Sequence, residues 1–168
     1  MSIRTTDRRA TFIATYNDDY PQVLAYLRRR SDYDHAAELA AEVFLRAWSK
    51  WEDAADPPLP WLYGIARNVL LEFYRKREQD QKLHRKAAAC NTVIALSAVD
   101  AVVSRLDVLS ALHELPESDQ EVLTLHTWES LSPKEIAQVL HISPENARVR
   151  LHRARQRLAE KLKEPSDG

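Results

Sequence analysis

Basic side chains recur along residues 143–163 at spacings that gather them on one side of a helix. The segment has five Arg and two Lys against two Glu, which leaves a net charge of +5. At about 100° per residue, the arc opposite its apolar residues consists of Glu145, Val149, His152, Arg153 and Gln156, flanked by Asn146 and Arg148. Long Arg side chains suit phosphate oxygens and guanine edges in the major groove of DNA. The pattern therefore favours DNA binding, with a charged helix in solvent as the alternative.

Two helix-start signals position this segment. Ser132 and Pro133 suit the cap and the first helical position, and Glu135 completes a capping box. Ser143 and Pro144 repeat that start about eleven residues later, after a short break in the apolar pattern. Two helices joined by such a tight turn form a helix-turn-helix. The core side of the second helix is predicted to consist of Ala147, Leu151, Ala154, Leu158 and Leu162.

The composition indicates an all-α protein. Among 168 residues only two are glycine, while alanine, leucine, arginine and glutamate are abundant. A chain of this length can form one domain or two small ones. Its charge is segregated, because residues 67–86 and 143–168 are basic and the remainder is acidic. Two basic islands fit two separate contacts with a polyanion.

Cysteine and histidine usage argues against metal and redox chemistry. The single cysteine, Cys90, excludes an internal disulfide and a multi-cysteine zinc site, and it favours a reducing compartment. The six histidines lack the spacing of a metal site, and no phosphate loop, nucleophile elbow or catalytic carboxylate pair is present. No apolar run reaches the length of about 18 residues that a membrane span needs. We therefore expect a cytoplasmic, non-enzymatic protein with no catalytic residues, metal or cofactor and no membrane insertion.

The apolar spacing predicts helices in two domains. After a polar start at 1–10, helices are expected at about 11–20, 21–30, 34–50, 61–77, 99–115 and 117–128, before the helix-turn-helix. A proline-rich loop is expected at 51–60. The predicted domains are residues 10–78 and 99–163, joined by a flexible linker at 79–98. The run Arg28–Arg30 fits a solvated helix end.

Two helices of the first domain have large apolar or aromatic residues among the polar residues on the side away from the predicted core. On the helix at 34–50 the predicted core arc is Leu39, Ala40, Val43, Phe44 and Ala47. Its other side has Glu38, Ala41, Glu42, Leu45 and Trp48. An exposed leucine and tryptophan suit a docking surface for another protein, and packing of Trp48 within its own domain is the equal alternative.

The helix at 61–77 interleaves aromatic rings with Arg and Asn. That mixture suits unpaired bases, although aromatic residues at helical spacing more often belong to a core.

Two parts of the chain resemble bacterial sigma factors of the sigma-70 family, in the short form of the extracytoplasmic-function (ECF) group. The first part contains AAELAAEVFLRAW and PWLYGIARNVLLEFYRKR, which resemble region two. The second is ALHELPESDQEVLTLHTWESLSPKEIAQVLHISPENARVRLHRARQRL, which resembles region four. The resemblance covers about residues 12–77 and 105–162. It implies a protein that binds core RNA polymerase, directs it to promoters and helps to melt the DNA, under the control of an anti-sigma factor.

The resemblance also implies a role for each surface. The polymerase is expected to contact Glu38, Ala41, Glu42, Leu45 and Trp48. The −10 element is expected to be bound as an unpaired strand by Asp53, Pro60, Trp61, Gly64, Arg67, Asn68 and Arg75. The −35 duplex is expected to be bound by Asn146, Arg148, Val149, Arg150, His152, Arg153 and Arg157, among which Arg150 and Arg157 are assigned to phosphates.

Three departures from the family pattern stand out. Ala41 occupies a position that is often glutamine, which removes one hydrogen bond to the polymerase. His141 replaces the usual glycine of the turn, where a left-handed backbone is mildly strained for histidine. Residues 144–147 differ from the usual small-residue start of the recognition helix. The alternative function is a helix-turn-helix regulator that acts without polymerase docking, as a dimer on a palindromic site.

Overall fold

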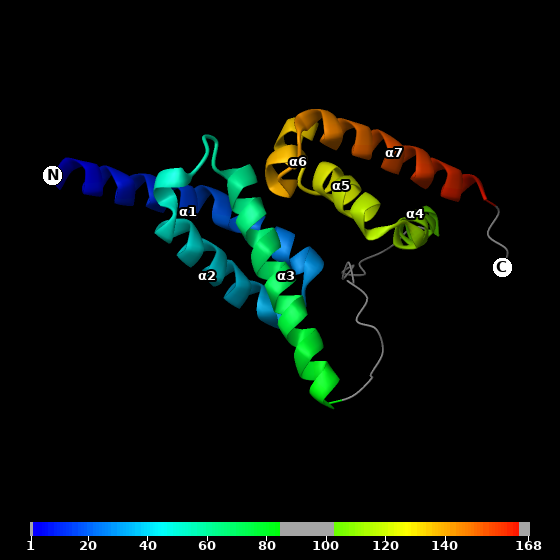
Figure 1. Cartoon of the computed structure of the whole chain (residues 1–168), viewed down its shortest axis with the longest axis horizontal. Coiled ribbons are helices and arrows are strands. Elements are labelled where there is room, and N and C mark those ends of the chain that lie inside the picture. Colours follow the sequence, from blue (N-terminus) through cyan, green and yellow to red (C-terminus); the bar gives the residue numbers. More distant parts are fainter. Residues whose placement is uncertain (1, 85–102, 165–168) are drawn as a thin grey trace. The chain divides into compact units, whose positions relative to one another are not determined.

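A computed structural model of the chain describes residues 2–84 and 103–164, with side chains over 7–81 and 107–164. The chain divides into two compact units. The first unit comprises α1 (Ser2–Arg30), α2 (Tyr33–Ser49), the short 3-10 helix η1 (Trp51–Asp53) and α3 (Leu59–His84). The second unit comprises α4 (Val103–Glu114), α5 (Glu117–Thr127), α6 (Pro133–Leu140) and α7 (Pro144–Lys163). The described residues contain no strand, so the all-α prediction is confirmed (Figure 1).

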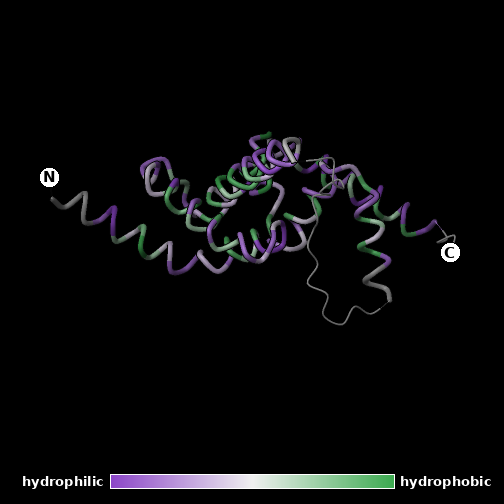
Figure 2. The backbone as a smooth tube through the Cα atoms, turned by 90° about the horizontal axis from the view of Figure 1, so that it is seen from below, coloured by the Kyte–Doolittle hydropathy of each residue, from purple (hydrophilic) through white to green (hydrophobic). Residues whose placement is uncertain are grey.

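In the first unit, α1, α2 and α3 each contact the other two. Purple and green residues alternate along these helices, as expected where one side of each helix is apolar (Figure 2). All five residues of the predicted core arc of α2 are buried: Leu39, Ala40, Val43, Phe44 and Ala47. Val23 and Leu27 of α1 and Leu62, Ala66 and Val69 of α3 complete much of this core. The core of the first unit is thus built from the periodic apolar residues that the sequence predicts.

The prediction of two helices over residues 11–30, after a polar start, is wrong. One helix, α1, runs from Ser2 to Arg30 and passes through the exposed Pro21. A proline inside a helix removes one backbone hydrogen bond and often kinks the helix. Here the aromatic rings of Tyr16 and Tyr20, before the proline, pack on Phe44 of α2. Val23, beyond the proline, is fully buried. Contacts on both sides of Pro21 therefore hold the two halves in one helix.

Helix α3 is longer than predicted at both ends. It begins at Leu59, with Pro60 in the first turn, where a missing N–H is tolerated. It continues to His84 and so occupies residues 79–84 of the expected linker. Residues 76–84, KREQDQKLH, are mostly strong helix formers. Arg77 also pairs with Asp32 at 2.6 Å, which ties this end of the helix to the α1–α2 turn.

Arg30 is buried, so the expected solvated end of α1 is wrong for this residue. Its guanidinium lies 3.9 Å from the ring centroid of Tyr26, and its carbonyl oxygen accepts a hydrogen bond from the Tyr74 hydroxyl. The ring of Tyr26 also packs on Tyr63, which is buried. The Arg30 guanidinium can be buried here because the face of the Tyr26 ring and polar partners compensate for its loss of hydration.

In the second unit, α7 contacts α4, α5 and α6. The predicted capping box is confirmed, because the Ser132 hydroxyl accepts from Glu135 N at 3.2 Å and Glu135 Oε1 accepts from Ser132 N at 3.1 Å. His141 ends α6 with φ 55° and ψ 44°, the left-handed conformation expected there. The Ser143 hydroxyl then caps α7 by accepting from Asn146 N at 3.1 Å. The helix-turn-helix is confirmed.

The structure does not describe residues 85–102. This range includes most of the expected linker with Cys90, and residues 99–102 of the next predicted helix.

Candidate nucleic-acid and protein interfaces

Helix α7 packs through a narrow stripe of small and aliphatic residues. Ala147, Leu151 and Ala154 are buried, and Leu158 is half-buried, as predicted. Leu162 is 45% exposed, so its predicted place in the core is wrong. It lies in the last turn of α7, which ends at Lys163. The narrow stripe leaves a wide arc of α7 in solvent, and that arc contains the predicted DNA-binding residues.

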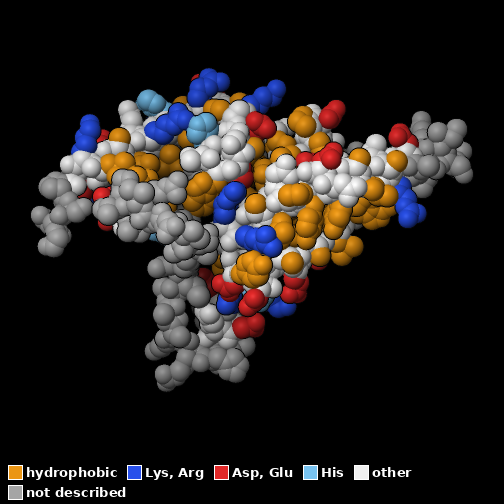
Figure 3. Space-filling view, turned by 180° about the vertical axis from the view of Figure 1, so that it is seen from behind, with side chains coloured by type: hydrophobic (Ala, Val, Ile, Leu, Met, Phe, Trp, Pro, Cys, Tyr) orange, Lys and Arg blue, Asp and Glu red, His pale blue; other side chains and the backbone are white. Residues whose placement is uncertain are grey.

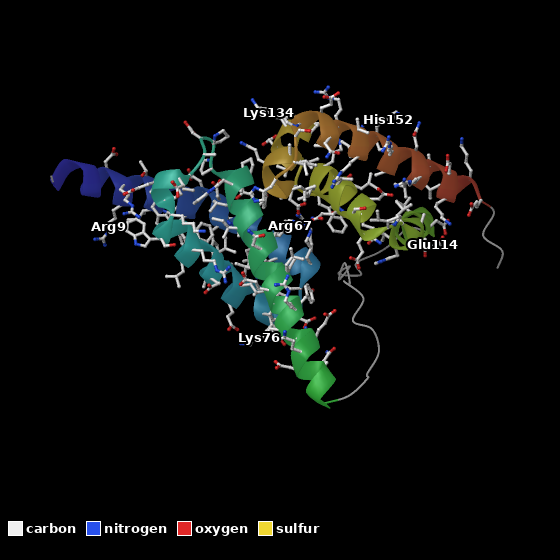
Figure 4. The ribbon with its side chains drawn as sticks, viewed as in Figure 1. Arg9, Arg67, Lys76, Glu114, Lys134 and His152 are labelled. Carbon is white, nitrogen blue, oxygen red and sulfur yellow. The ribbon has the colours of Figure 1, made fainter. Side chains whose placement is uncertain are left out.

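Every residue predicted to meet the −35 duplex is exposed: Asn146, Arg148, Val149, Arg150, His152, Arg153 and Arg157. Basic and histidine side chains gather along the α6–α7 edge of the second unit (Figure 3). Lys134, at the start of α6, is also exposed. The sequence interpretation did not include it. Its side chain is labelled together with that of His152 in Figure 4. The capping box at Ser132 and Glu135 places Lys134 in the first turn of α6, and this is the sequence signal that could have supported its inclusion.

Contacts within the second unit involve three arginines of α7, namely Arg150, Arg157 and Arg155. Arg150 Nε donates to Asn146 Oδ1 at 3.2 Å, which orients both side chains on the surface. Arg157 Nη1 lies 2.7 Å from Asp119 Oδ2, and the Asp119 side chain is only 7% exposed. Arg157 therefore neutralises a buried carboxylate of α5, in addition to any contact with phosphate. By contrast, Arg148, His152 and Arg153 make no side-chain hydrogen bond or ion pair with the described residues.

Arg155 and His126 form a link that the sequence did not indicate. Nη2 of Arg155 lies 2.6 Å from Nε2 of His126, and His126 Nδ1 lies 2.9 Å from the carbonyl oxygen of Leu131. A carbonyl oxygen can only accept, so Nδ1 donates the proton and Nε2 accepts from the guanidinium. The neutral imidazole thus connects α7 with α5 and the turn before α6. The sequence interpretation gave Arg155 no role, because no local signal pairs it with a residue of another helix.

The predicted docking residues of α2 lie on its solvent side. Glu38, Ala41 and Leu45 are exposed, Glu42 is half-buried, and Leu45 reaches 66% exposure. Trp48 satisfies both interpretations made from the sequence. Its ring packs on Phe12 at 5.1 Å between centroids, yet the residue remains 36% exposed. Part of the indole therefore packs against α1, where the Arg8 guanidinium also lies 4.6 Å from its ring centroid, and the remainder is exposed.

Helix α1 adds apolar residues to this surface. Ile13 is 48% exposed and Tyr16 is 40% exposed. Tyr16 contacts Phe44, and Phe44 contacts the Phe12 ring that supports Trp48. Hydrophobic side chains gather where α1 and α2 lie side by side (Figure 3). The sequence interpretation missed Ile13 and Tyr16 because it assigned helix 11–20 no partner, and only the packing of α1 on α2 shows which side remains open.

One arginine connects the docking helix to α3. Arg46 Nε lies 2.8 Å from Glu42 Oε1, while Nη1 and Nη2 donate to the two oxygens of Glu72 at 3.1 and 2.6 Å. The hydrogen bond from Arg46 lowers the pKa of the Glu72 carboxyl below its ordinary value of 4.5. The same pairing, together with Glu42, raises the pKa of Arg46 further above its usual range. Arg46 thus remains charged and holds α2 and α3 together at their surface.

The predicted −10 residues of η1, the following loop and α3 differ in exposure. Asp53, Asn68 and Arg75 are exposed, and Trp61 and Arg67 are half-buried. Pro60 and Gly64 are buried, so they offer no side-chain surface to a nucleic acid. Arg67 and Lys76 are labelled on α3 in Figure 4. Leu71 is an exposed leucine on the same side of α3, at 46%. The surface therefore combines one indole with cations and an amide.

No group of three or more His, Cys, Asp or Glu side chains suited to a metal ion occurs within 2–84 or 103–164. Over those same ranges, no helix has both the length and the apolar character needed to cross a bilayer.

Two family models match the chain. Sigma-70 region 2 matches residues 15–79, and Sigma-70, region 4 matches residues 105–158. The first match covers the predicted docking side of α2 and the predicted −10 surface, and the second covers the helix-turn-helix. The two matched regions occur in the same order as in the resemblance noted from the sequence.

Curated proteins and solved structures agree with these matches. The chain is 30% identical over 144 residues to the ECF RNA polymerase sigma factor SigM of Bacillus subtilis, covering 84% of this chain and 86% of that relative. It is 28% identical over 172 residues to SigW of the same organism, covering 94% and 90%. Its fold is similar to that of the sigma factor RpoE bound to the anti-sigma factor NepR from Bartonella quintana, with a TM-score of 0.65, 23% identity and coverage of 92% and 98%. CnrH in complex with the cytosolic domain of CnrY has a TM-score of 0.57, 23% identity and coverage of 94% and 88%.

Proposed function

Because the chain belongs to the ECF group of the sigma-70 family, we propose that it binds core RNA polymerase, directs it to promoters and helps to separate the DNA strands there. The polymerase supplies the catalytic site, and this chain supplies the promoter contacts. The observation that carries the proposal is that one chain combines an exposed apolar docking side on α2 with an exposed basic face on α7. A regulator that only binds duplex DNA has no need of the docking side.

Docking is assigned to the solvent side of α2. Leu45 and Trp48 are the apolar anchors, and Glu38 and Glu42 lie around them as a polar rim. Interfaces of this kind derive most of their binding energy from a few large anchors inside a rim that excludes water. Ala41 offers only a methyl group, so docking here relies more on apolar contact than on a side-chain hydrogen bond at that position.

Strand capture is assigned to the end of η1, the loop that follows it and the exposed side of α3. The Trp61 indole offers a face for an unpaired base, Arg67 and Arg75 offer cations to the backbone, and Asn68 offers an amide to a base edge. Flipping a base costs a few kcal/mol of lost stacking, which such contacts offset. The buried Pro60 and Gly64 shape the backbone under this surface.

Duplex recognition is assigned to α7. His152, Arg153 and Val149 lie at the centre of the exposed arc and are assigned to base edges in the major groove. Arg148 flanks them there. Arg150 lies at the margin and is assigned to phosphate, and Arg157 divides its charge between phosphate and Asp119. Lys134, in the first turn of α6, is added to the phosphate contacts.

Control is assigned to an anti-sigma protein that covers the docking side. RpoE and CnrH, which share this fold, were each solved in complex with another protein, NepR and the cytosolic domain of CnrY respectively. In this chain an exposed leucine and a half-packed tryptophan form a surface that a regulator and the polymerase cannot occupy together. Competition for Leu45 and Trp48 would keep the chain inactive.

The test is transcription by core RNA polymerase that lacks every other sigma factor, on a library of genomic fragments, with and without this chain. We expect discrete RNA starts that share an upstream two-part element and vanish without the chain. A stable complex that gives no starts would contradict the initiation role. Absence of any complex would contradict docking itself and would favour the regulator that binds a palindromic site.

A further inference from the structure

The first turns of α1 contact the segment that leads into the predicted −10 surface. Arg8 Nη2 donates to the Trp48 carbonyl oxygen at 2.8 Å, and the guanidinium lies 4.6 Å from the Trp48 ring centroid. Arg8 also faces Glu52 of η1 at 3.6 Å. These contacts fasten α1 to the last turn of α2 and to η1, directly before the loop that follows.

Trp51, which directly precedes Glu52, is held by two further residues of α1, Thr11 and Phe12. Its indole Nε1 donates to Thr11 Oγ1 at 3.1 Å, and its ring meets that of Phe12 edge-on at 5.2 Å. On its other side the ring lies 6.1 Å from the ring of Trp61, between centroids. Trp61 is the one indole of the proposed strand-binding surface. A shift of Trp51 would therefore be transmitted to both the start of the loop and the ring on which a base would stack.

Thr11 is oriented to accept this hydrogen bond. Its hydroxyl lies 3.0 Å from the Asp7 carbonyl oxygen and 2.9 Å from that of Arg8, so its own proton points into the helix backbone. A lone pair of the same oxygen then faces the indole N–H. The Trp51 side chain is thus held by a donor–acceptor pair and two ring contacts, which fix both its position and its rotation.

We propose that Thr11 and Phe12 are positioning residues for promoter melting that hold Trp51 in place, while Arg8 fixes the neighbouring Trp48 and Glu52. Through Trp51, residues 54–58 and Trp61 are kept in the arrangement that captures an unpaired base. The inference rests on the proposed sigma-factor function. The sigma-70 region 2 match begins at residue 15, so all three residues precede the part of the chain that the family model describes. Thr11 and Phe12 are linked to Trp61 of the proposed −10 surface through the Trp51 side chain.

Thr11→Val is the cleanest test, because it removes the hydroxyl while keeping the size and branching of the side chain. Phe12 also supports Trp48, so its replacement would mix docking with melting. Thr15→Val is the matched control: Thr15 lies one turn further along α1, and its hydroxyl makes no hydrogen bond with the described residues. Thr11→Ser restores the hydroxyl, and Trp51→Phe removes the other half of the pair.

Holoenzymes would be assembled with each full-length variant on a promoter found by the transcription test, and open complex would be measured by permanganate reactivity of unpaired thymines. We expect Thr11→Val to lower the open-complex equilibrium by about 2- to 10-fold, the value of one neutral hydrogen bond. Thr11→Ser and Thr15→Val should match the wild type. Trp51→Phe should lower opening at least as much as Thr11→Val, because it also shrinks the ring that packs on Phe12 and Trp61. Adding Thr11→Val to Trp51→Phe should have little further effect, since the bond that both remove is already gone.

Polymerase affinity and −35 preference should be equal in all variants, which separates positioning from a general loss of stability. Equal opening by Thr11→Val and Thr15→Val would overturn the inference while leaving the proposed function intact. A loss of opening that follows a parallel loss of polymerase affinity would also overturn it. A wild-type chain that opens no promoter would overturn the proposed function and this inference together.

Discussion

Helices α3 and α7 both face promoter DNA in the proposed mechanism, but they are packed in different ways. Every assigned residue of α7 is exposed, because a narrow stripe around Ala147, Leu151 and Ala154 is enough to hold the helix. On α3, Pro60 and Gly64 are buried and Trp61 and Arg67 are half-buried, since α1 and α2 both pack on this helix. A helix that enters a major groove must present a broad free side. A surface that holds a single flipped base needs rings and cations that are supported from behind.

The two helices also differ in how firmly their exposed side chains are held in place. Arg148 and Arg153 of α7 make no side-chain hydrogen bond or ion pair with the described residues, so they can adjust to a base sequence. The aromatic ring of Trp61, by contrast, is supported by Trp51 and, through it, by α1. We therefore expect substitutions to separate into those that affect docking and melting and those that affect duplex recognition.

The largest expected effect is on docking. Replacing both Leu45 and Trp48 with alanine should weaken binding of core polymerase by 2 kcal/mol or more, about 30-fold, because large exposed anchors dominate such interfaces. Titration of labelled chain with core polymerase measures this affinity. Tyr33→Ala is the control, since Tyr33 is a more exposed aromatic residue, at 76%, at the opposite end of α2. Equal losses in both proteins would remove the docking assignment from Leu45 and Trp48.

Arg153→Ala should change duplex recognition without changing docking. Loss of a good contact with a base costs about 1–3 kcal/mol, which corresponds to about 5- to 150-fold in use of a −35-dependent promoter. Transcription from promoters with intact and altered −35 elements would show a reduced ratio. Lys163→Ala, in the last turn of the same helix, removes an equal charge and should leave the ratio almost unchanged. An unchanged ratio for Arg153→Ala would show that the face is wrongly assigned.

Arg157→Ala should destabilise only the second unit. The substitution leaves the buried Asp119 carboxylate without its partner, at a cost of about 1–2 kcal/mol for a pair whose arginine is half exposed. Hydrogen–deuterium exchange over residues 103–164 should become faster, and the first unit should not change. Adding Asp119→Asn should recover much of the loss, because the unpaired charge is gone. Faster exchange in both units would show that the effect is not local to this pair.

The smallest expected effect concerns pH. Arg46 lowers the pKa of Glu72, so the ionised pair stabilises the first unit above about pH 4.5 and this contribution is lost as the pH falls further. Glu72 is exposed, so the contribution should be well under 1 kcal/mol and weaker in salt. Glu72→Gln should flatten the pH dependence of urea unfolding on the acid side. Burial raises the pKa of Asp19, which acts in the opposite direction in both proteins. Equal slopes for both proteins would refute the prediction.

Several features of the fold follow from local sequence. The Ser132–Glu135 capping box, the second cap at Ser143 and the left-handed His141 all form as predicted. Each depends on hydrogen bonds between residues at most four apart, which a sequence shows directly. The faces of α2 and α7 were predictable for the same reason, since the helical repeat alone decides which residues share a side.

The errors occur where a distant segment decides the outcome. Pro21 was expected to separate two helices, yet packing of Tyr16 and Tyr20 on Phe44 before it and burial of Val23 after it keep α1 continuous. Arg30 was expected in solvent, yet Tyr26 and Tyr74 surround it. Leu162 was expected in the core, yet it is exposed in the last turn of α7. In each case the local sequence preference was weak. The outcome depended on whether a neighbouring helix packs against the residue.

The sequence by itself determined the helical class, the helix-turn-helix with its caps and the membership of each helical face. Only the tertiary structure decided which of those faces are covered. It buried Gly64 and Pro60, divided Trp48 between a packed and an open side, and joined Thr11 to Trp51 across forty residues of chain. The physical reason is that helical angle depends on near neighbours along the chain, whereas burial depends on which other helix occupies the adjacent space.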